Sequence, residues 1–218
     1  RWTTRYSEHD PFGSLYGSMH ETGHGTYEQG RPRELDFQPA GKANGLGVHE
    51  SQSRLWENQI GRSLEFCHWS LPLWKEAFPE KMQDIDAEML WRAVNVVEPS
   101  LIRVEADEAT YNIHIMIRYE IEKLLISGDL EVDELPGKWD DMYEEYLGIR
   151  PTDYSSGVLQ DIHWSMGAIG YFPTYTLGNL YSAQLLSAAR GDLPEHDLQI
   201  RKGDFSPLLD WMRRKVHG

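Results

Sequence analysis

Two histidines and a glutamate near the start of the chain have the spacing of a metal site that hydrolyses amide bonds. The segment 20–24 reads H-E-T-G-H, which matches the H-E-x-x-H pattern of metalloproteases. Residues four apart lie on one face of a helix, so His20 and His24 can present imidazole nitrogens to one ion. Glu21 projects about 100° away from His20, where its carboxylate can take a proton from water beside the ion and pass it to the leaving amine. The motif therefore predicts metal-assisted hydrolysis with Glu21 as the general base.

A catalytic zinc site of this kind needs a third protein ligand. After a loop rich in Gly, Pro and Asn, a second helical segment begins near His49 and Glu50. A carboxylate near the start of a helix that packs against the first one can complete the site, and we expect Glu50 to be the ligand. His49 is the competing candidate, because imidazole also binds zinc. Cys67 is the only cysteine, which excludes both a cysteine zinc site and an internal disulfide.

Four further segments contain motifs that extend this pattern along the chain. They are R-W-T at 1–3, H-E-S-Q at 49–52, I-R-V-E-A-D at 102–107 and G-V-L-Q-D-I-H-W at 157–164. With the segment 20–24 they resemble, in order, the motifs of the thermostable (Taq-type) metallocarboxypeptidases, whose helical fold is related to those of thimet-type oligopeptidases and angiotensin-converting enzyme. The resemblance spans essentially the whole chain, and the ordered set is far more specific than H-E-x-x-H alone.

The resemblance implies a mainly α, helical zincin-like (gluzincin) catalytic half that removes residues from the C-termini of peptides, and it implies a homodimer. It also implies Glu50 as the third ligand, and both Zn²⁺ and Co²⁺ suit the His-His-Glu set. Two departures are clear: R-W-T lacks the family's leading Asp, and the family's H-P-F motif and long N-terminal helical region are absent. D-P-F at 10–12 is interpreted instead as a helix start capped by Asp10.

The tetrahedral oxyanion of amide hydrolysis needs hydrogen-bond donors. His163 and Tyr175 resemble the His and Tyr donors of the related helical peptidases, and we expect both to be catalytic. Tyr171 is the alternative to Tyr175 and is otherwise expected at the substrate-binding surface. For each tyrosine the competing interpretation is a packed aromatic ring whose hydroxyl is satisfied within the protein.

A carboxypeptidase must also hold the free carboxylate of its substrate, for which a bidentate arginine is well suited. Arg103 lies inside one of the motifs and is favoured over Arg5 for this role. The competing interpretation of Arg103 is an ordinary ion pair with Asp107 or Glu105. Asp107 and Asp161 are candidates for orienting histidines, and Asp107 is equally a helix cap.

The elements that must position these residues are mostly helical and form a single domain over residues 1–218. The spacing of apolar residues, together with Gly and Pro at the ends of segments, distinguishes helices from a small β element. Helices are expected at 12–29, from about 47 to a kink or break at Pro72, at 86–93, 107–125 and 140–147, from 158 to about 189 with an interruption at 170–173, and at 206–216. Strands are expected at 1–6 and in a hairpin over 94–104.

Composition excludes several classes of function. The chain has 21 Lys and Arg against 35 Asp and Glu, a formal net charge of −14, which repels nucleic acid and anionic lipid. No apolar run is long enough for a membrane span, and we expect a protein without a signal peptide. A single thiol fits a reducing cytoplasm.

Two alternatives to the carboxypeptidase remain open on the sequence. One is a truncated homologue that binds metal, or a peptide, without turnover, because half of the cleft is missing if the N-terminal region is absent. The other is a related zinc oligopeptidase or endopeptidase. The endopeptidase differs in not needing a free substrate carboxylate, and the truncated homologue differs in holding metal without hydrolysis.

Overall fold

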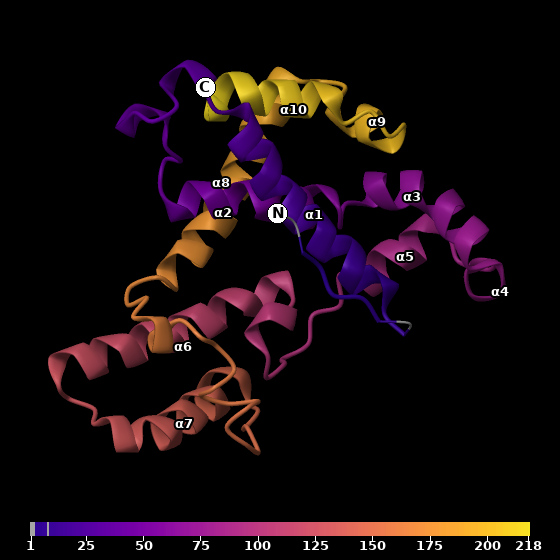
Figure 1. Cartoon of the computed structure of the whole chain (residues 1–218). Helices are drawn as coiled ribbons and strands as arrows, with labels where there is room; N and C mark the ends of the chain where they lie inside the picture. Colours follow the sequence, from indigo (N-terminus) through magenta and orange to yellow (C-terminus); the bar gives the residue numbers. More distant parts are fainter. Residues whose placement is uncertain (1–2, 8) are drawn as a thin grey trace. The chain divides into compact units, whose positions relative to one another are not determined.

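Helix α1 (Pro11–Gly30) carries the H-E-x-x-H segment in the computed structural model (Figure 1). Asp10 caps its start, because the Asp10 carboxylate accepts a hydrogen bond from a backbone N–H in the first turn. The helix gives way to extended backbone at Arg31, because the following Pro32 disfavours the α conformation in the residue before it. The helix and the cap expected from sequence are both confirmed.

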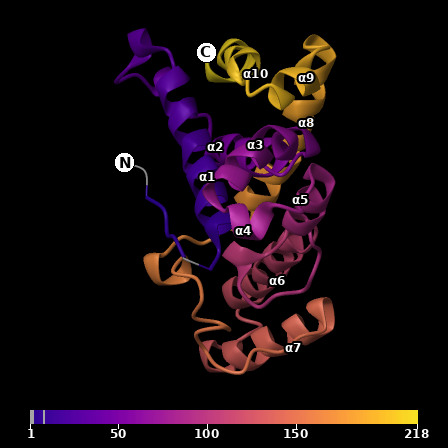
Figure 2. The same ribbon diagram turned by 90° about the vertical axis from the view of Figure 1, so that its right-hand side faces the viewer.

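The structure describes residues 3–7 and 9–218, which fall into two compact units (Figure 2). Unit 1 comprises Arg1–Asn95 and Leu177–Gly218, and unit 2 comprises Val96–Thr176. Helix α8 (Pro173–Asp192) begins in unit 2 and continues in unit 1. The single domain over residues 1–218 stays a prediction. Within the described part of the chain, no helix is both long enough and apolar enough to cross a membrane.

Helix α2 (Leu46–Arg54) carries the second motif and continues into a π-helical turn, η3 (Leu55–Ile60). Helix α3 (Leu64–Ala77) begins after a short break, because the Ser63 hydroxyl accepts a hydrogen bond from a backbone N–H in its first turn. The expected break at Pro72 is replaced by this earlier one, and α3 continues through Pro72. Between α1 and α2 the loop forms two 3-10 turns, η1 (Arg33–Leu35) and η2 (Pro39–Gly41).

Glycines allow three helices of unit 1 to approach one another at the second motif. A Cβ on Gly23 of α1 would lie 2.4 Å from the backbone oxygen of Gln52 and 2.5 Å from Cα of Ser53, both in α2. A Cβ on Gly178 of α8 would lie 2.6 Å from Cγ of Glu50. The α2 backbone therefore packs against Gly23, and the Glu50 side chain packs against Gly178. Any residue larger than glycine at either position would force the helices apart.

The remaining helices of unit 1 build its hydrophobic core around these elements. They are α4 (Pro79–Met82), α5 (Ala87–Val94), α9 (His196–Arg201), α10 (Ser206–Met212) and the π-helical turn η7 (Arg213–His217). One buried cluster joins η3, α3, α8, α9 and α10, and a second joins α1, α3 and α5. The helices expected at 86–93 and 206–216 are confirmed, whereas the short α4 and α9 were not expected.

Unit 2 is built on two helices that lie side by side, α6 (Glu108–Ser127) and α7 (Leu135–Leu147) (Figures 1 and 2). Asp107 caps α6, and Gly128 ends it with a φ of 79°, a left-handed conformation that suits glycine. Ile117, Ile121 and Trp139 lie in the apolar core between them. The 3-10 turns of the unit are η4 (Arg103–Glu105), η5 (Val132–Glu134) and η6 (Trp164–Met166).

The β element expected from sequence is wrong, because no described residue forms a strand. Arg1 and Trp2 lie outside the described residues, and residues 3–7 form no regular secondary structure. In the region of the expected hairpin, side chains take the place of a cross-strand partner. The backbone N–H of Glu98 bonds to Asp107, and the backbone N–H of Arg103 bonds to the side-chain oxygen of Gln160.

The segment from 158 to 172 is also not the helix that we expected. It consists of turns around η6, and α8 begins only at Pro173. Gly167 ends η6 with a φ of 72°, and Gly170 adopts a φ of 75° in the turn before α8; such left-handed conformations interrupt a helix and suit glycine. Helix α7 begins five residues earlier than the expected 140, at Leu135.

We predict that Gly23→Ala destabilises unit 1, because the new Cβ meets backbone atoms of α2 that cannot move independently of the helix. Overpacking of this kind costs about 1–3 kcal/mol. Thermal or denaturant unfolding measures the effect. The control is Gly191→Ala at the end of α8, where a Cβ meets nothing within 4 Å, and it should stabilise the protein slightly. Equal stability of the two variants would contradict the close approach at Gly23.

Candidate metal centre

The structure brings His20, His24 and Glu50 together in unit 1. One potential ligand atom from each lies within 4.8 Å of the others. Nε2 of His24 lies 3.5 Å and Nε2 of His20 lies 3.9 Å from Oε2 of Glu50. Glu50 is buried, and both histidines are half-buried. Two imidazoles and one carboxylate form the donor set of a catalytic zinc site, which leaves a fourth position open for water.

Each imidazole has its outer nitrogen occupied by a hydrogen-bond acceptor. Nδ1 of His20 lies 2.9 Å from Oε2 of Glu57, and Nδ1 of His24 lies 3.1 Å from the backbone oxygen of His49. A neutral imidazole that donates from Nδ1 keeps its lone pair on Nε2, which is the nitrogen that faces Glu50 in both cases. The residues therefore fit a divalent ion in donor type, grouping and orientation.

His49 contacts the outer side of His24. Its Nδ1 lies 2.6 Å from Nδ1 of His24, and its Nε2 lies 2.9 Å from a carboxylate oxygen of Glu28. The structure thus groups Glu50, and not His49, with the two histidines of the motif.

Glu57 is a member of the site that the sequence analysis missed. It follows Glu50 by two helical turns, so helical periodicity alone could have placed it on the same face. Burial raises the pKa of Glu57, but the charge of Arg54 and the hydrogen bond from His20 outweigh burial and hold the pKa below its ordinary value. Burial lowers the pKa of His20, but the bond to Glu57 and the charges of Glu50 and Glu57 raise it overall.

Glu21 directly follows His20 in α1 and is half-buried. Its carboxylate forms no hydrogen bond or ion pair with any described residue, in contrast to Glu57. A base must have an accessible lone pair, and nothing within the described chain occupies that of Glu21.

Unit 2 holds a second polar group, centred on Asp161. Oδ1 of Asp161 accepts from Nη2 of Arg103 at 2.7 Å, and Oδ2 accepts from Nε of Arg118 at 2.7 Å. Arg103 is only 4% exposed, and its Nη1 donates to the hydroxyl of Tyr111 at 2.8 Å. The ion pair of Arg103 is therefore with Asp161, not with Asp107 or Glu105. Binding of a substrate carboxylate by Arg103 stays a prediction, and the burial of the guanidinium restricts access to it.

His163, Tyr171 and Tyr175 form one aromatic group in unit 2. Nε2 of His163 lies 3.0 Å from the hydroxyl of Tyr175, and the ring of Tyr171 lies 5.1 Å from that of His163. Asp161 does not orient His163 directly, because the closest nitrogen is 3.7 Å from its carboxylate. Burial lowers the pKa of His163.

Glu122 holds the segment between His163 and Tyr171 and was also missed. It is 5% exposed and accepts hydrogen bonds from the indole N–H of Trp164 at 2.8 Å and from the backbone N–H of Gly170 at 3.1 Å. No local sequence signal connects Glu122 to this segment, because the two are distant in the chain. Arg5, the competing candidate for substrate binding, is exposed.

We predict that Glu57→Gln weakens Zn²⁺ binding about tenfold, since outer partners of ligating histidines contribute about 10–100-fold to metal affinity. The amide keeps the shape of the side chain but loses the charge that makes the His20 imidazole a better ligand. Competition with a chelator measures the affinity. Glu76→Gln removes the same charge from an exposed position on α3 and should leave the affinity unchanged. An unchanged affinity in Glu57→Gln would contradict the assignment.

We predict that Asp161→Asn destabilises unit 2 by about 3–5 kcal/mol, because it leaves two buried guanidinium groups without their shared anion. Asp141→Asn breaks an exposed ion pair with Arg150 in the same unit and should change the denaturant midpoint little.

The same carboxylate makes stability depend on pH. Burial raises the pKa of Asp161, but the hydrogen bond from Arg103 and the charges of Arg118 and Arg103 hold it below 3.8. A carboxyl with a lowered folded pKa stabilises the native state above its unfolded pKa, and this stabilisation is lost as the pH falls through the folded value. Unfolding measured below pH 4 should therefore show a steeper loss in the parent than in Asp161→Asn, and equal slopes would contradict this.

Comparison with known proteins places this chain among known metallopeptidases. The chain matches the family model described as Carboxypeptidase Taq (M32) metallopeptidase over residues 1–218. It is 50% identical over 217 residues to thermostable carboxypeptidase 1 of Thermus thermophilus, covering 100% of this chain and 42% of that protein. It is 46% identical over 220 residues to carboxypeptidase 1 of Bacillus subtilis, covering 100% of this chain and 43% of that protein.

Solved structures of carboxypeptidases are also similar to this chain. The M32 carboxypeptidase of Deinococcus radiodurans has a TM-score of 0.94 at 44% identity, over 99% of this chain and 44% of that one. A carboxypeptidase of Pyrococcus furiosus has a TM-score of 0.93 at 45% identity, over 99% of this chain and 43% of that one. The chain spans less than half the length of these relatives. The resemblance to the family and the helical fold are confirmed, and the chain belongs to the Carboxypeptidase Taq (M32) metallopeptidase family.

Proposed function

We propose that this chain is the metal-binding, catalytic portion of a metallocarboxypeptidase that hydrolyses the C-terminal bond of peptides. The observation that carries the proposal is the grouping of His20, His24 and Glu50, with both Nε2 atoms turned toward the carboxylate. Membership of the family and the names of the relatives, which are carboxypeptidases, support the reaction.

The three residues would hold Zn²⁺, with Co²⁺ as an alternative that the same donor set accepts. A bound ion of this type supplies Lewis acidity to the scissile carbonyl and lowers the pKa of water. Glu21 accepts the proton of the attacking water at its carboxylate and transfers it to the leaving amine. Its freedom from other partners supports this role.

The remaining roles follow the family resemblance. His163 and Tyr175 donate hydrogen bonds to the oxyanion, while Tyr171 and Arg103 contact the substrate. The pairing of His163 with the hydroxyl of Tyr175 at 3.0 Å supports a joint role, because the two donors are already held in one place within unit 2. For Arg103, the burial of the guanidinium argues for a role that also includes holding Asp161.

The setting of the reaction is proposed from the composition of the chain and from the family resemblance. The buried, unpaired thiol of Cys67 fits a cytoplasmic protein, where thiols stay reduced. The net charge of −14 argues against nucleic acid as a partner. A homodimer is proposed on the family resemblance alone.

The test is a peptidase assay on matched peptides with a free or an amidated C-terminus, with the chain loaded with Zn²⁺ or Co²⁺. We predict release of single residues from the free peptide only, and a loss of at least about 100-fold in kcat for Glu21→Gln, as expected for removal of a general base. Because Glu21 is not a ligand, the variant should keep its metal.

Other outcomes of the assay would point elsewhere. Cleavage of both peptides would support an endopeptidase or oligopeptidase. Stoichiometric metal without cleavage of either peptide would mean that the chain binds the ion but does not complete the active site.

A further inference from the structure

A buried histidine outside the metal site contacts the helix that carries Glu50. His217 lies in η7 and is 4% exposed, and its Nε2 lies 3.0 Å from the side-chain oxygen of Gln52 in α2. Gln52 is 1% exposed. Neither the sequence motifs nor the proposed reaction gives His217 a role.

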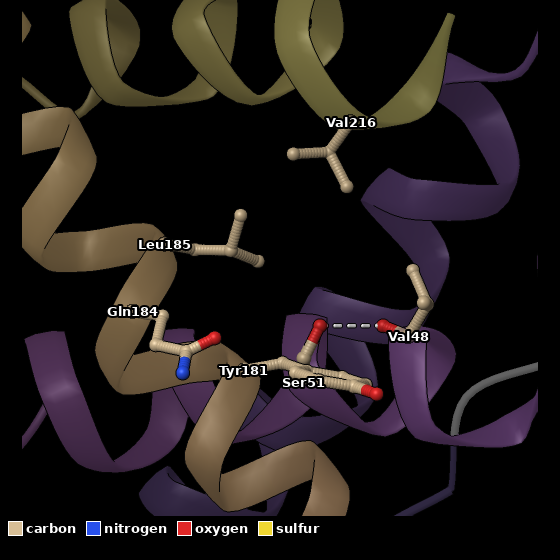
Figure 3. A pocket seen from close by; sticks show the side chains of 6 residues that line it. All are labelled: Val48, Ser51, Tyr181, Gln184, Leu185 and Val216. Atoms are coloured by element: carbon tan, nitrogen blue, oxygen red, sulfur yellow. Dashed lines mark hydrogen bonds between the residues drawn. The ribbon is translucent and has the colours of Figure 1, made fainter.

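The hydrogen bonds around Gln52 form a chain in which each group donates to the next, from His217 towards Val48. The hydroxyl of Ser51 donates to the backbone oxygen of Val48 at 2.6 Å, as Figure 3 shows. Since its proton is used there, the Ser51 oxygen accepts from the side-chain N–H of Gln52 at 3.0 Å. The side-chain oxygen of Gln52 therefore faces His217, and Nε2 of His217 must carry a proton that it donates.

The surroundings of His217 favour this single tautomer. Its Nδ1 is buried without a partner among the described residues and lies where a Cβ on Gly30 would be only 2.2 Å away. Burial, aided by the charge of Arg213, lowers the pKa of His217 to about 4, so the ring is neutral near pH 7. An unpaired buried nitrogen is costly, and an apolar side chain would fill this space better. The bond to Gln52 is what distinguishes histidine from such a residue.

Gln52 is thus held from two sides. Its backbone oxygen lies against Gly23, between the two histidines of the H-E-x-x-H segment, and its side chain is held by His217. The chain of bonds ends at Val48, one turn before Gln52, so it spans the turn of α2 that contains Glu50. Figure 3 shows Val216, the neighbour of His217, over a pocket of about 260 Å³ lined also by Val48 and Ser51.

We propose that His217 is a positioning residue for the metal ligand Glu50, acting through Gln52 and Ser51 on the first turns of α2. The inference rests on the proposed function, because it assumes that Glu50 binds the ion. Without the donor on His217, the amide of Gln52 can turn, the Ser51 oxygen loses the bond from Gln52, and the Glu50 carboxylate samples orientations that do not face both imidazoles.

The experiment compares three variants of the chain. His217→Phe keeps a planar ring but has no donor, and His217→Gln keeps an N–H at the end of the side chain. His196→Phe is the matched control, because His196 is also a buried histidine of unit 1, at 3% exposure, but lies in α9 away from α2. Zn²⁺ affinity is measured by chelator competition, and the Co²⁺ absorption spectrum reports the geometry of the donor set.

We expect His217→Phe to weaken Zn²⁺ binding about tenfold and to change the Co²⁺ spectrum, as loss of an outer positioning contact does at other metal sites. His217→Gln should recover most of the affinity and the parent spectrum. His196→Phe should lower the melting temperature without changing either. Adding His217→Phe to Gln52→Leu should cause little further loss, since the two act on one chain of bonds. Parent-like binding in His217→Phe, or an equal loss in His196→Phe, would overturn the proposal.

A second readout separates this proposal from the proposed function. Amide hydrogen exchange of residues 50–53 in the metal-free chain should be faster in His217→Phe than in the parent and in His196→Phe. A parent chain that binds no zinc would contradict the proposed function. In that case faster exchange would still support a role of His217 in fixing α2, whereas unchanged exchange would overturn that role as well.

Discussion

The contact between the backbones of α1 and α2 at Gly23 is the constraint on which the metal site depends. Two of the proposed ligands come from α1 at a spacing that any helix provides, but the third proposed ligand comes from α2 and must be brought to them. No Cβ fits between Gly23 and the backbone oxygen of Gln52. The absence of a side chain at Gly23 therefore sets how far Glu50 lies from the two imidazoles. Gly178 repeats the arrangement on the other side of Glu50.

Buried charge in both units is held by fixed partners. In unit 1, Glu57 is shared between His20 and Arg54, which keeps it ionised despite burial and orients the imidazole. In unit 2, Asp161 plays the corresponding part for two guanidinium groups. Ionised side chains in a low-dielectric interior are stable only with such partners, and each partner also restricts rotation. The same interactions that compensate burial therefore hold the polar groups in place.

The sequence predicts the part of the site that depends on neighbouring residues. Prediction from sequence fails where contacts between residues far apart in the chain determine the structure. The H-E-x-x-H spacing is a property of one helix, so α1, its cap and its two proposed ligands follow from residues 10–32. The hairpin over 94–104 fails because Asp107 and Gln160 satisfy backbone N–H groups that a strand would pair. Glu57 had a usable signal in its helical register with Glu50. Glu122 and His217 had none, because their partners are far away in the chain.

Asp161 holds together distant parts of the native chain, as a covalent crosslink does in other proteins. Its bonds to Arg103 and Arg118 join positions 58 and 43 residues apart in sequence, and closing loops of this length costs chain entropy that the native contact must offset. A disulfide would lower that cost by restricting the unfolded chain, but a protein with one cysteine has no such option. The carboxylate closes both loops with a single side chain. A reducing environment, which would open a disulfide, leaves this closure intact.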